Sequence, residues 1–234
     1  MANCANLLLL AVTATVASAG TIQLEAISGY LHADGALVTQ LTSSSTGYFS
    51  TLDGNNAGQL GWTFTNSTSA TMTNVLFFGF VDADLDRDLN SFFNEYGTFY
   101  SLSLLQDAPA GAIAPGQWQI DEPGYLFGTI VSDLQAGSLR NTNSVPSSAP
   151  DDVSLALGFQ IGSLAPGQSV SLVLRIANTN IGGLQQVDPD SGSQFFLNGY
   201  AALAEPVSTS VPEPANVALL TLPVLFLFRR FLSK

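Results

Sequence analysis

Sulfur and imidazole side chains are scarce in this 234-residue chain, and their scarcity excludes several kinds of site. Cys4 is the only cysteine, so the rest of the chain has no disulfide, no thiolate nucleophile and no sulfur ligand for a metal. His32 is the only histidine, which leaves too few ligands for a zinc site. No serine lies in a G-x-S-x-G motif that would pair with His32 as a general base. We therefore interpret His32 as a surface or edge histidine.

Positive charge is also nearly absent. Lys234 is the only lysine, and between residues 25 and 213 three arginines stand against 18 acidic residues, a formal net charge of −15. Such a surface repels phosphate backbones, which excludes nucleic acid as a partner. It can attract divalent cations. With no disulfide available, a folded domain must depend on its hydrophobic core, and the 46% content of hydrophobic residues is sufficient to build one.

The first 19 residues have the pattern of a secretory signal peptide. An apolar stretch begins at Leu7 and leads to Ala17-Ser18-Ala19, an A-x-A cleavage site that places Gly20 at the start of the mature chain. This pattern implies the secretion machinery as a partner and an exported product. An uncleaved membrane anchor is the alternative.

From residue 21 onward the chain alternates short apolar segments with turn residues. In residues 59–66, Leu60, Trp62 and Phe64 share one face of an extended strand, so Trp62 is expected in the core. Pro166-Gly167 between two strands predicts a hairpin turn. The predicted strands are residues 21–31, 36–41, 59–66, 74–81, 97–105, 125–133, 153–161, 169–176 and 195–203.

The other segments between residues 20 and 203 are polar or short. We expect long polar loops at residues 140–152 and 178–193, and at most two helical turns each at residues 88–96 and 131–139. In residues 97–105 the apolar side chains do not keep one parity, which predicts a bulge or burial on both faces. The expected fold of residues 20–203 is an all-β, antiparallel β-sandwich of the jelly-roll or Ig-like kind, with a closed barrel as the alternative.

The C-terminal 24 residues, 211–234, combine three parts in a fixed order. Val211-Pro212-Glu213-Pro214 forms a rigid turn, an uncharged apolar run covers residues 215–228, and Arg229-Arg230 end that run. A 14-residue helix rises about 21 Å, against roughly 30 Å of bilayer hydrocarbon, so Phe231 and Leu232 and snorkelling arginines are needed to complete a transmembrane helix. The arginines should remain cytoplasmic, with all upstream residues outside. A buried core helix is the alternative. Residues 204–210 are a short linker.

This order of parts resembles the sorting tail of PEP-CTERM proteins, which Gram-negative bacteria that make exopolysaccharide export. The resemblance implies that Pro212, Glu213 and Pro214 are recognised, and that the tail is cleaved there, by an exosortase. It also implies that Arg229 and Arg230 are the stop signal. The body of the chain is broadly similar to other ectodomains of this family at residues 74–85 and 152–176, which implies a sandwich and no particular chemistry.

One dense group of carboxylates interrupts the strand pattern. Asp82, Asp84, Asp86 and Asp88 occupy alternate positions and Glu95 follows, an arrangement that suits the oxygen-rich coordination of Ca²⁺. Counted from Asp84 the spacing imitates an EF-hand loop, but Leu89 stands where the sharp turn requires glycine. A solvated acidic connection after the strand is the alternative interpretation.

Three functions are compatible with these observations. The first is a non-enzymatic exported surface or extracellular-matrix protein, anchored in the membrane by its tail, processed by an exosortase and associated with exopolysaccharide. The second is a Ca²⁺-dependent adhesin or polysaccharide-binding module that uses residues 82–95, for which the exposed Trp118 is a candidate sugar-stacking side chain. The third is a secreted hydrolase, for which the sequence identifies no carboxylate pair. No cofactor is expected apart from this Ca²⁺.

Overall fold

The computed structural model describes residues 20–204 of the chain. Gly20, predicted to follow the signal cleavage site, is the first described residue, and Ala204 is the last. The predicted signal peptide and sorting tail lie outside the described residues, with Ala17, Ala19, Val211, Pro212, Glu213, Pro214, Arg229 and Arg230.

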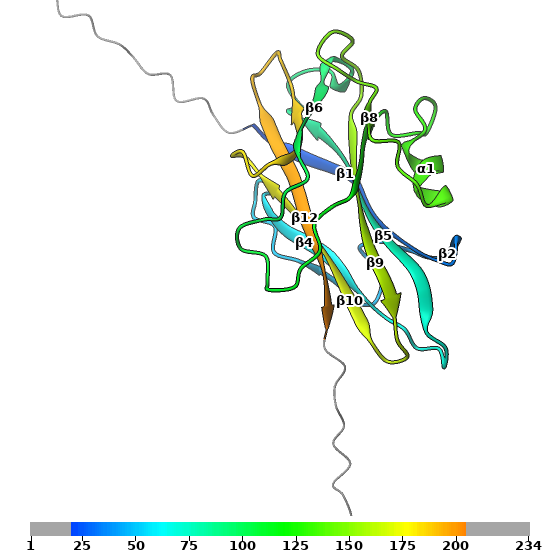
Figure 1. Ribbon diagram of the computed structural model, residues 1–234. Coiled ribbons are helices and arrows are strands. Elements are labelled where there is room, and N and C mark those ends of the chain that lie inside the picture. Colours follow the sequence, from blue (N-terminus) through cyan, green and yellow to red (C-terminus); the bar gives the residue numbers. More distant parts are fainter. Residues whose placement is uncertain (1–19, 205–234) are drawn as a thin grey trace, which may run out of the picture. The chain divides into compact units, whose positions relative to one another are not determined.

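The described residues form an all-β structure of two six-stranded sheets, which confirms the predicted class (Figure 1). Every pair of neighbouring strands is antiparallel except β7 and β8. In spatial order, sheet A contains β2 (Ala36–Leu41), β1 (Ile22–Ala33), β5 (Met72–Leu85), β9 (Ser154–Leu164), β7 (Gln117–Asp121) and β8 (Thr142–Asn143). Sheet B contains β3 (Tyr48–Ser50), β4 (Gly58–Thr65), β10 (Ser169–Ala177), β12 (Gln194–Ala204), β11 (Gly183–Val187) and β6 (Tyr96–Ser101).

The main hydrophobic core lies between the two sheets. Successive side chains of a strand point to opposite faces, so the odd-numbered residues of β5, including Phe77 and Val81, face sheet B. Trp62 of β4 and Leu172 of β10 meet them from sheet B. Trp62 is fully buried, as expected from its alternation, and its indole N–H donates to the Thr42 carbonyl at 2.9 Å. Burial of the ring thus leaves no unpaired donor.

A smaller second core covers the outer face of sheet A. The even-numbered Phe78 and Phe80 of β5 pack there against Ile130 and Leu134 of the short helix α1 (Ile130–Ala136). The helix ends at Gly137, whose φ of 77° is a left-handed conformation that glycine adopts without strain. The central part of β5 is therefore covered on both faces, which accounts for the apolar run of residues 75–81.

His32 lies in this second core, so its interpretation as a surface or edge histidine was wrong. Its ring is buried, Nε2 lies 2.8 Å from the Leu134 carbonyl oxygen, and its edge meets Phe78 at a centroid distance of 5.7 Å. The histidine is buried because α1 covers the end of β1, a long-range contact that the sequence around residue 32 does not encode.

Two further predictions need correction. Residues 125–133 are not a strand but a loop followed by the first turn of α1. The Pro166-Gly167 turn does not join a hairpin, because β9 belongs to sheet A and β10 to sheet B. Turn residues reverse the chain direction but do not specify which strands pair. The predicted loops also contain the short strands β8 and β11.

The bulge predicted in residues 97–105 is confirmed, but the strand found there, β6, is shorter than predicted. Strand β6 ends at Ser101, and its register against β11 shifts between Phe99 and Ser101, so Tyr100 is the extra residue of a bulge. The helical turns expected at residues 88–96 form the 3₁₀ turn η1 (Phe92–Asn94). No helix in residues 20–204 has the length and apolar character that a membrane span requires.

The inter-sheet core predicts the effect of shortening Phe77, which has no exposed surface. We expect Phe77→Ala to lower the free energy of unfolding by about 3–5 kcal/mol, since it removes a buried ring and leaves a cavity between the sheets. Chemical denaturation of the purified chain measures this change. The matched control is Phe127→Ala at a largely exposed phenylalanine, for which we expect less than about 0.5 kcal/mol. Equal effects of the two substitutions would contradict the assigned core.

Candidate functional site

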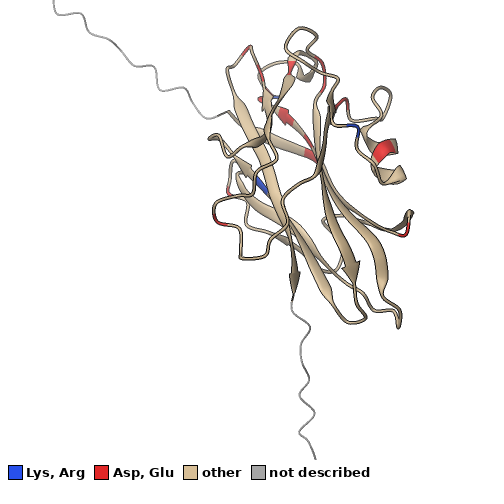
Figure 2. Cartoon of the chain, in the orientation of Figure 1, with Lys and Arg blue, Asp and Glu red and all other residues tan. Residues whose placement is uncertain are grey.

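An acidic cavity of about 290 Å³ opens at one end of sheet A. Its lining residues come from β1, β5, the β5–β6 connection, the β7–α1 loop and the segment before β9. They are Glu25, Asp82, Asp84, Arg87, Phe92, Tyr125 and Asp152, and we call this set the acidic cavity. Four carboxylates and one guanidinium therefore share a small volume. Figure 2 shows how strongly acidic positions outnumber basic ones over the described residues.

Strand pairing brings the carboxylates together. Asp82 and Asp84 continue the even-numbered face of β5, beyond the point where Phe78 and Phe80 are covered by α1. In the sheet register Asp82 lies opposite Ala26 of β1 and Ser154 of β9. Glu25 of β1 lies one residue from its partner Ala26, and Asp152 precedes β9, two residues from Ser154; both line the same cavity. No local sequence pattern could have identified these two residues as part of the site.

Arg87 is the only basic residue of the cavity. Its guanidinium forms an ion pair with Glu25, lies 3.4 Å from the Asp84 carboxylate, and sits 5.9 Å from the centre of the Phe92 ring. A cation above an aromatic face is attracted by the negative charge distribution of the ring. Since Arg87 is half-exposed, these contacts are screened by water, and its single charge balances only part of the cavity.

Asp82 is the most deeply buried carboxylate of the site. Its side chain belongs to a residue that is only 3% exposed, and the Tyr125 hydroxyl beside it is the one polar neighbour that favours its charged form. Burial and the neighbouring negative charges, that of Asp152 first among them, raise the pKa of Asp82 to about 7. The Asp82 charge is therefore costly to hold in this cavity.

The pKa values of two further carboxylates, Asp84 on β5 and Asp152 before β9, are also raised. Burial, followed by the charge of Asp84, raises the pKa of Asp152 to about 6. Burial and Glu25 raise the pKa of Asp84, while Arg87 lowers it. The charged state of the cavity thus changes across the neutral pH range, where isolated aspartates remain ionised.

The five predicted Ca²⁺ ligands are divided among different environments. Asp82 and Asp84 line the acidic cavity, whereas Asp86 has a φ of 53° and accepts hydrogen bonds from the Thr21 N–H at 2.8 Å and from the Ser193 hydroxyl. Asp88 accepts from the Gln23 amide at 3.1 Å. In the described part of the chain, no three His, Cys, Asp or Glu side chains are placed to hold a metal ion.

Glu95 is buried in the interior and serves a structural purpose there. It accepts hydrogen bonds from the Leu85 N–H at 2.7 Å and from the Gln186 amide, which link the loop before β6 to β5 and β11. Burial raises its pKa to about 8 despite these two donors. Both carboxylate oxygens already have partners, so Glu95 is directed to the protein and not to the acidic cavity.

Two other side chains have structural contacts. Trp118, expected at the surface, is half-buried because its ring stacks on Phe99 at a centroid distance of 4.3 Å and an angle of 17°, which joins β7 to β6. Asp188 lies in a turn and accepts hydrogen bonds from Asn90 and Asn94. A second, polar cavity of about 810 Å³ lies beside the Arg175–Asp107 ion pair.

No known family model matches this chain, and neither the curated proteins nor the solved structures compared with it give a match.

The raised pKa of Asp82 predicts how stability depends on pH. The unfolded carboxyl ionises near pH 4 and the folded one near pH 7, so its contribution to stability is lost as the pH rises through this interval. Asp82→Asn removes the charge and keeps the shape. We expect this variant to match the wild type at pH 4 and to exceed it by about 2–4 kcal/mol at pH 8 in denaturant titrations.

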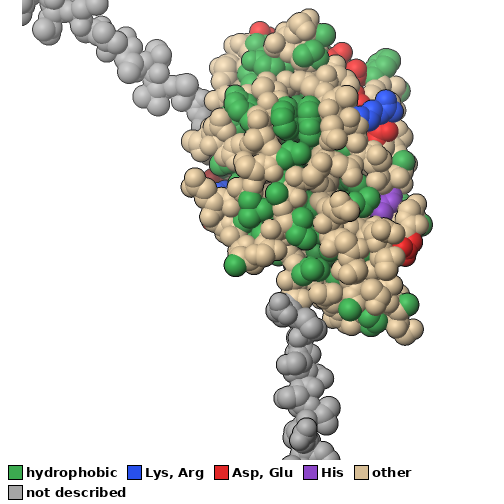
Figure 3. Space-filling model, in the orientation of Figure 1, with side chains coloured by type: hydrophobic (Ala, Val, Ile, Leu, Met, Phe, Trp, Pro, Cys, Tyr) green, Lys and Arg blue, Asp and Glu red, His purple; other side chains and the backbone are tan. Residues whose placement is uncertain are grey.

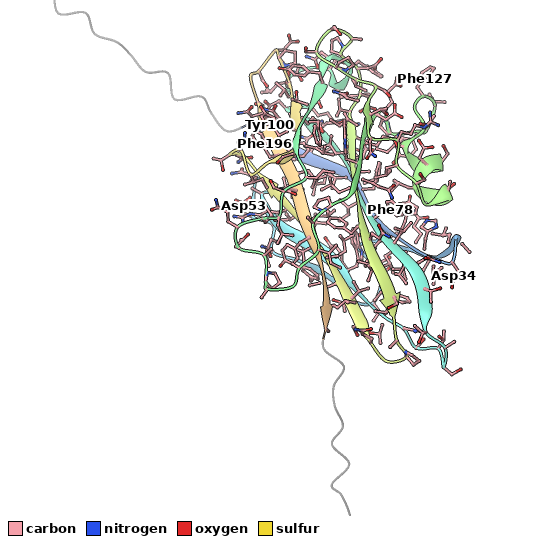
Figure 4. The ribbon with its side chains drawn as sticks, viewed as in Figure 1. Asp34, Asp53, Phe78, Tyr100, Phe127 and Phe196 are labelled. Atoms are coloured by element: carbon pink, nitrogen blue, oxygen red, sulfur yellow. The ribbon has the colours of Figure 1, made fainter. Side chains whose placement is uncertain are left out.

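Asp34→Asn is the matched control for this experiment. Asp34 occupies the β1–β2 turn with a φ of 52°, a conformation that asparagine also tolerates, and Figure 4 shows it well apart from Phe127. We expect no pH-dependent gain from this substitution. If Asp82→Asn were equally destabilised at both pH values, the assignment of a costly charge to Asp82 would be refuted.

Proposed function

We propose that this protein is a non-enzymatic exported surface or extracellular-matrix protein, sorted by its C-terminal tail and processed by an exosortase. The observation that carries the proposal is the order of Pro212-Glu213-Pro214, the apolar run and Arg229-Arg230 in the sequence. In the proposed topology the secretion machinery exports the chain, the tail holds it in the membrane, and residues 20–203 become an ectodomain in an exopolysaccharide-rich envelope.

The fold of the described residues supports this proposal in two ways. Residues 20–204 enclose their own core without a disulfide, so a product released from both terminal segments would keep its interior intact. Thr21 donates to Asp86, and a side chain at residue 20 would collide with Ser193. A mature chain that begins at Gly20 would therefore retain the contacts that fix the start of β1.

We assign the ectodomain to the β-sandwich architecture of the jelly-roll or Ig-like kind. Two mostly antiparallel sheets that share one core support the sandwich, and their separate edges are consistent with it. Such a scaffold suits a surface protein because its loops at either end can carry binding residues while the sheets remain rigid.

The proposal predicts defined ends for the mature protein. In the cells that produce it, we expect intact mass and terminal peptide mapping to give a product that starts at Gly20 and ends between Val211 and Pro214. Deletion of residues 211–234 should abolish both the C-terminal processing and the localisation of the wild-type protein. A mature product that retained Arg229 and Arg230 would contradict exosortase processing and indicate a permanent anchor.

The chain provides a matched control for the motif. Glu205-Pro206 is the same dipeptide as Glu213-Pro214 but lies outside the tail. We expect Glu213→Ala with Pro214→Ala to prevent processing, and Glu205→Ala with Pro206→Ala to leave it unchanged. Equal effects of the two double variants would show that the linker composition and not the motif is recognised.

A further inference from the structure

The acidic cavity contains negative charge that the protein itself does not compensate. Asp82 and Asp84 are 3% and 4% exposed, and Arg87 contacts only Glu25 and Asp84 among the four carboxylates. Asp82 lines the cavity beside Asp152, and its polar neighbour Tyr125 is a neutral hydroxyl that brings no positive charge. Buried carboxylates that outnumber their cationic partners are costly, and a bound cation would reduce that cost.

The size and lining of the cavity favour an organic cation over a metal ion. Ca²⁺ requires six to eight oxygens at about 2.3–2.6 Å, and the described carboxylates do not adopt such an arrangement. A volume of about 290 Å³ accommodates a flat group with its own hydrogen-bond donors. Arg87 demonstrates the preference, because its guanidinium already lies between Glu25, Asp84 and the Phe92 ring. The wall formed by Asp82, Asp152 and Tyr125 offers a second position of the same chemistry.

Exposed hydrophobic residues follow two lining residues of the cavity in the chain, and we call them its apolar rim. Tyr125 continues into Leu126 and Phe127, and these side chains are 68%, 89% and 69% exposed. Phe92, which also lines the cavity, is in ring contact with Phe93, which is 59% exposed. In the space-filling view, hydrophobic side chains project at the upper right, at the loop where Phe127 is labelled in the stick view (Figures 3 and 4). Exposed apolar side chains that are grouped in this way mark surfaces that bind other molecules.

We propose that the acidic cavity binds an arginine side chain of a partner protein, presented on a segment with apolar residues on both sides. Asp82 and Asp152 accept hydrogen bonds from the guanidinium, because its planar fork matches carboxylates better than an ammonium does. Tyr125, Leu126, Phe127 and Phe93 contact the flanking apolar side chains. Charge complementarity and the apolar rim select this partner over a hydrophilic amino sugar, which would leave the rim exposed. This site does not depend on the proposed sorting tail.

The test measures binding of a short peptide to the full-length chain held in phosphatidylcholine nanodiscs. The probe is acetyl-Leu-Phe-Arg-Phe-Leu-amide, and its control carries citrulline, a neutral analogue of nearly the same shape, in place of arginine. At pH 8 we expect calorimetry to show saturable binding of the arginine peptide and at least tenfold weaker binding of the citrulline peptide. Binding should weaken as the pH falls through 7 and 6, because Asp82 and Asp152 become protonated and lose their negative charge. The other charged or titratable groups that face the ligand are Glu25, Asp84, Arg87 and Tyr125.

Two variants separate binding from folding. Asp82→Asn should lower the affinity for the arginine peptide at least tenfold, and the variant should be as stable as the wild type or more stable. Substitution of a purely structural aspartate would not give this combination. Phe127→Ala should lower the affinity for the arginine peptide several-fold. Its stability should be unchanged, because this side chain is largely exposed. Asp34→Asn, which makes the same chemical change at a distant turn, should leave the affinity unchanged.

Several outcomes would overturn the proposal. Equal affinity for the arginine and citrulline peptides would show that the guanidinium is not recognised. Equal effects of Asp82→Asn and Asp34→Asn would place the binding elsewhere. Binding of glucosamine oligomers that depends on Asp82, without binding of the peptide, would identify an amino-sugar site. A rise in the thermal midpoint with millimolar CaCl₂ that Asp82→Asn abolishes would identify a metal site.

Discussion

The structure depends on one geometric constraint, the alternation of side chains along the central strand β5. Its odd-numbered side chains fill the space between the two sheets, and its even-numbered side chains first pack under α1 and then, at Asp82 and Asp84, line the acidic cavity. Hydrophobic and acidic residues therefore share one face of one strand. A change of one residue in the register of β5 would exchange the two faces, so the core and the cavity cannot be altered independently.

The cavity also shows how a β scaffold can hold charges that repel each other. The hydrogen-bonded pairing of β5 with β1 and β9 fixes Glu25, Asp82 and Asp152 close together, and the free energy of core burial offsets the electrostatic cost. Carboxylates held together at such an electrostatic cost are common at functional sites. A domain without disulfides can tolerate this cost only because its two sheets enclose an extensive apolar interior.

Much of the fold was predictable because strand signals are local. Alternation located β1, β2, β4 and β12 to within a few residues, and it placed Trp62 in the core. The partners of these strands were not predictable. The Pro166-Gly167 turn predicts a hairpin, but the chain crosses there from sheet A to sheet B. The surface position predicted for His32 is wrong because α1, about 100 positions further along the chain, covers this residue. Pairing and coverage depend on long-range contacts that no short window contains.

Composition and a period of two along the chain are enough to show that the body of this protein is acidic, has no disulfide and consists of β-strands. The sequence also identified Asp82 and Asp84 as notable carboxylates. Which acidic residues lie together depends on how the strands pair in the folded chain. Spacing grouped Asp82 with Asp86, Asp88 and Glu95, but the twist and pairing of the strands turn those three toward other partners and bring Glu25 and Asp152 into their place. Electrostatic interaction depends on distance in space, which separation along the chain does not specify.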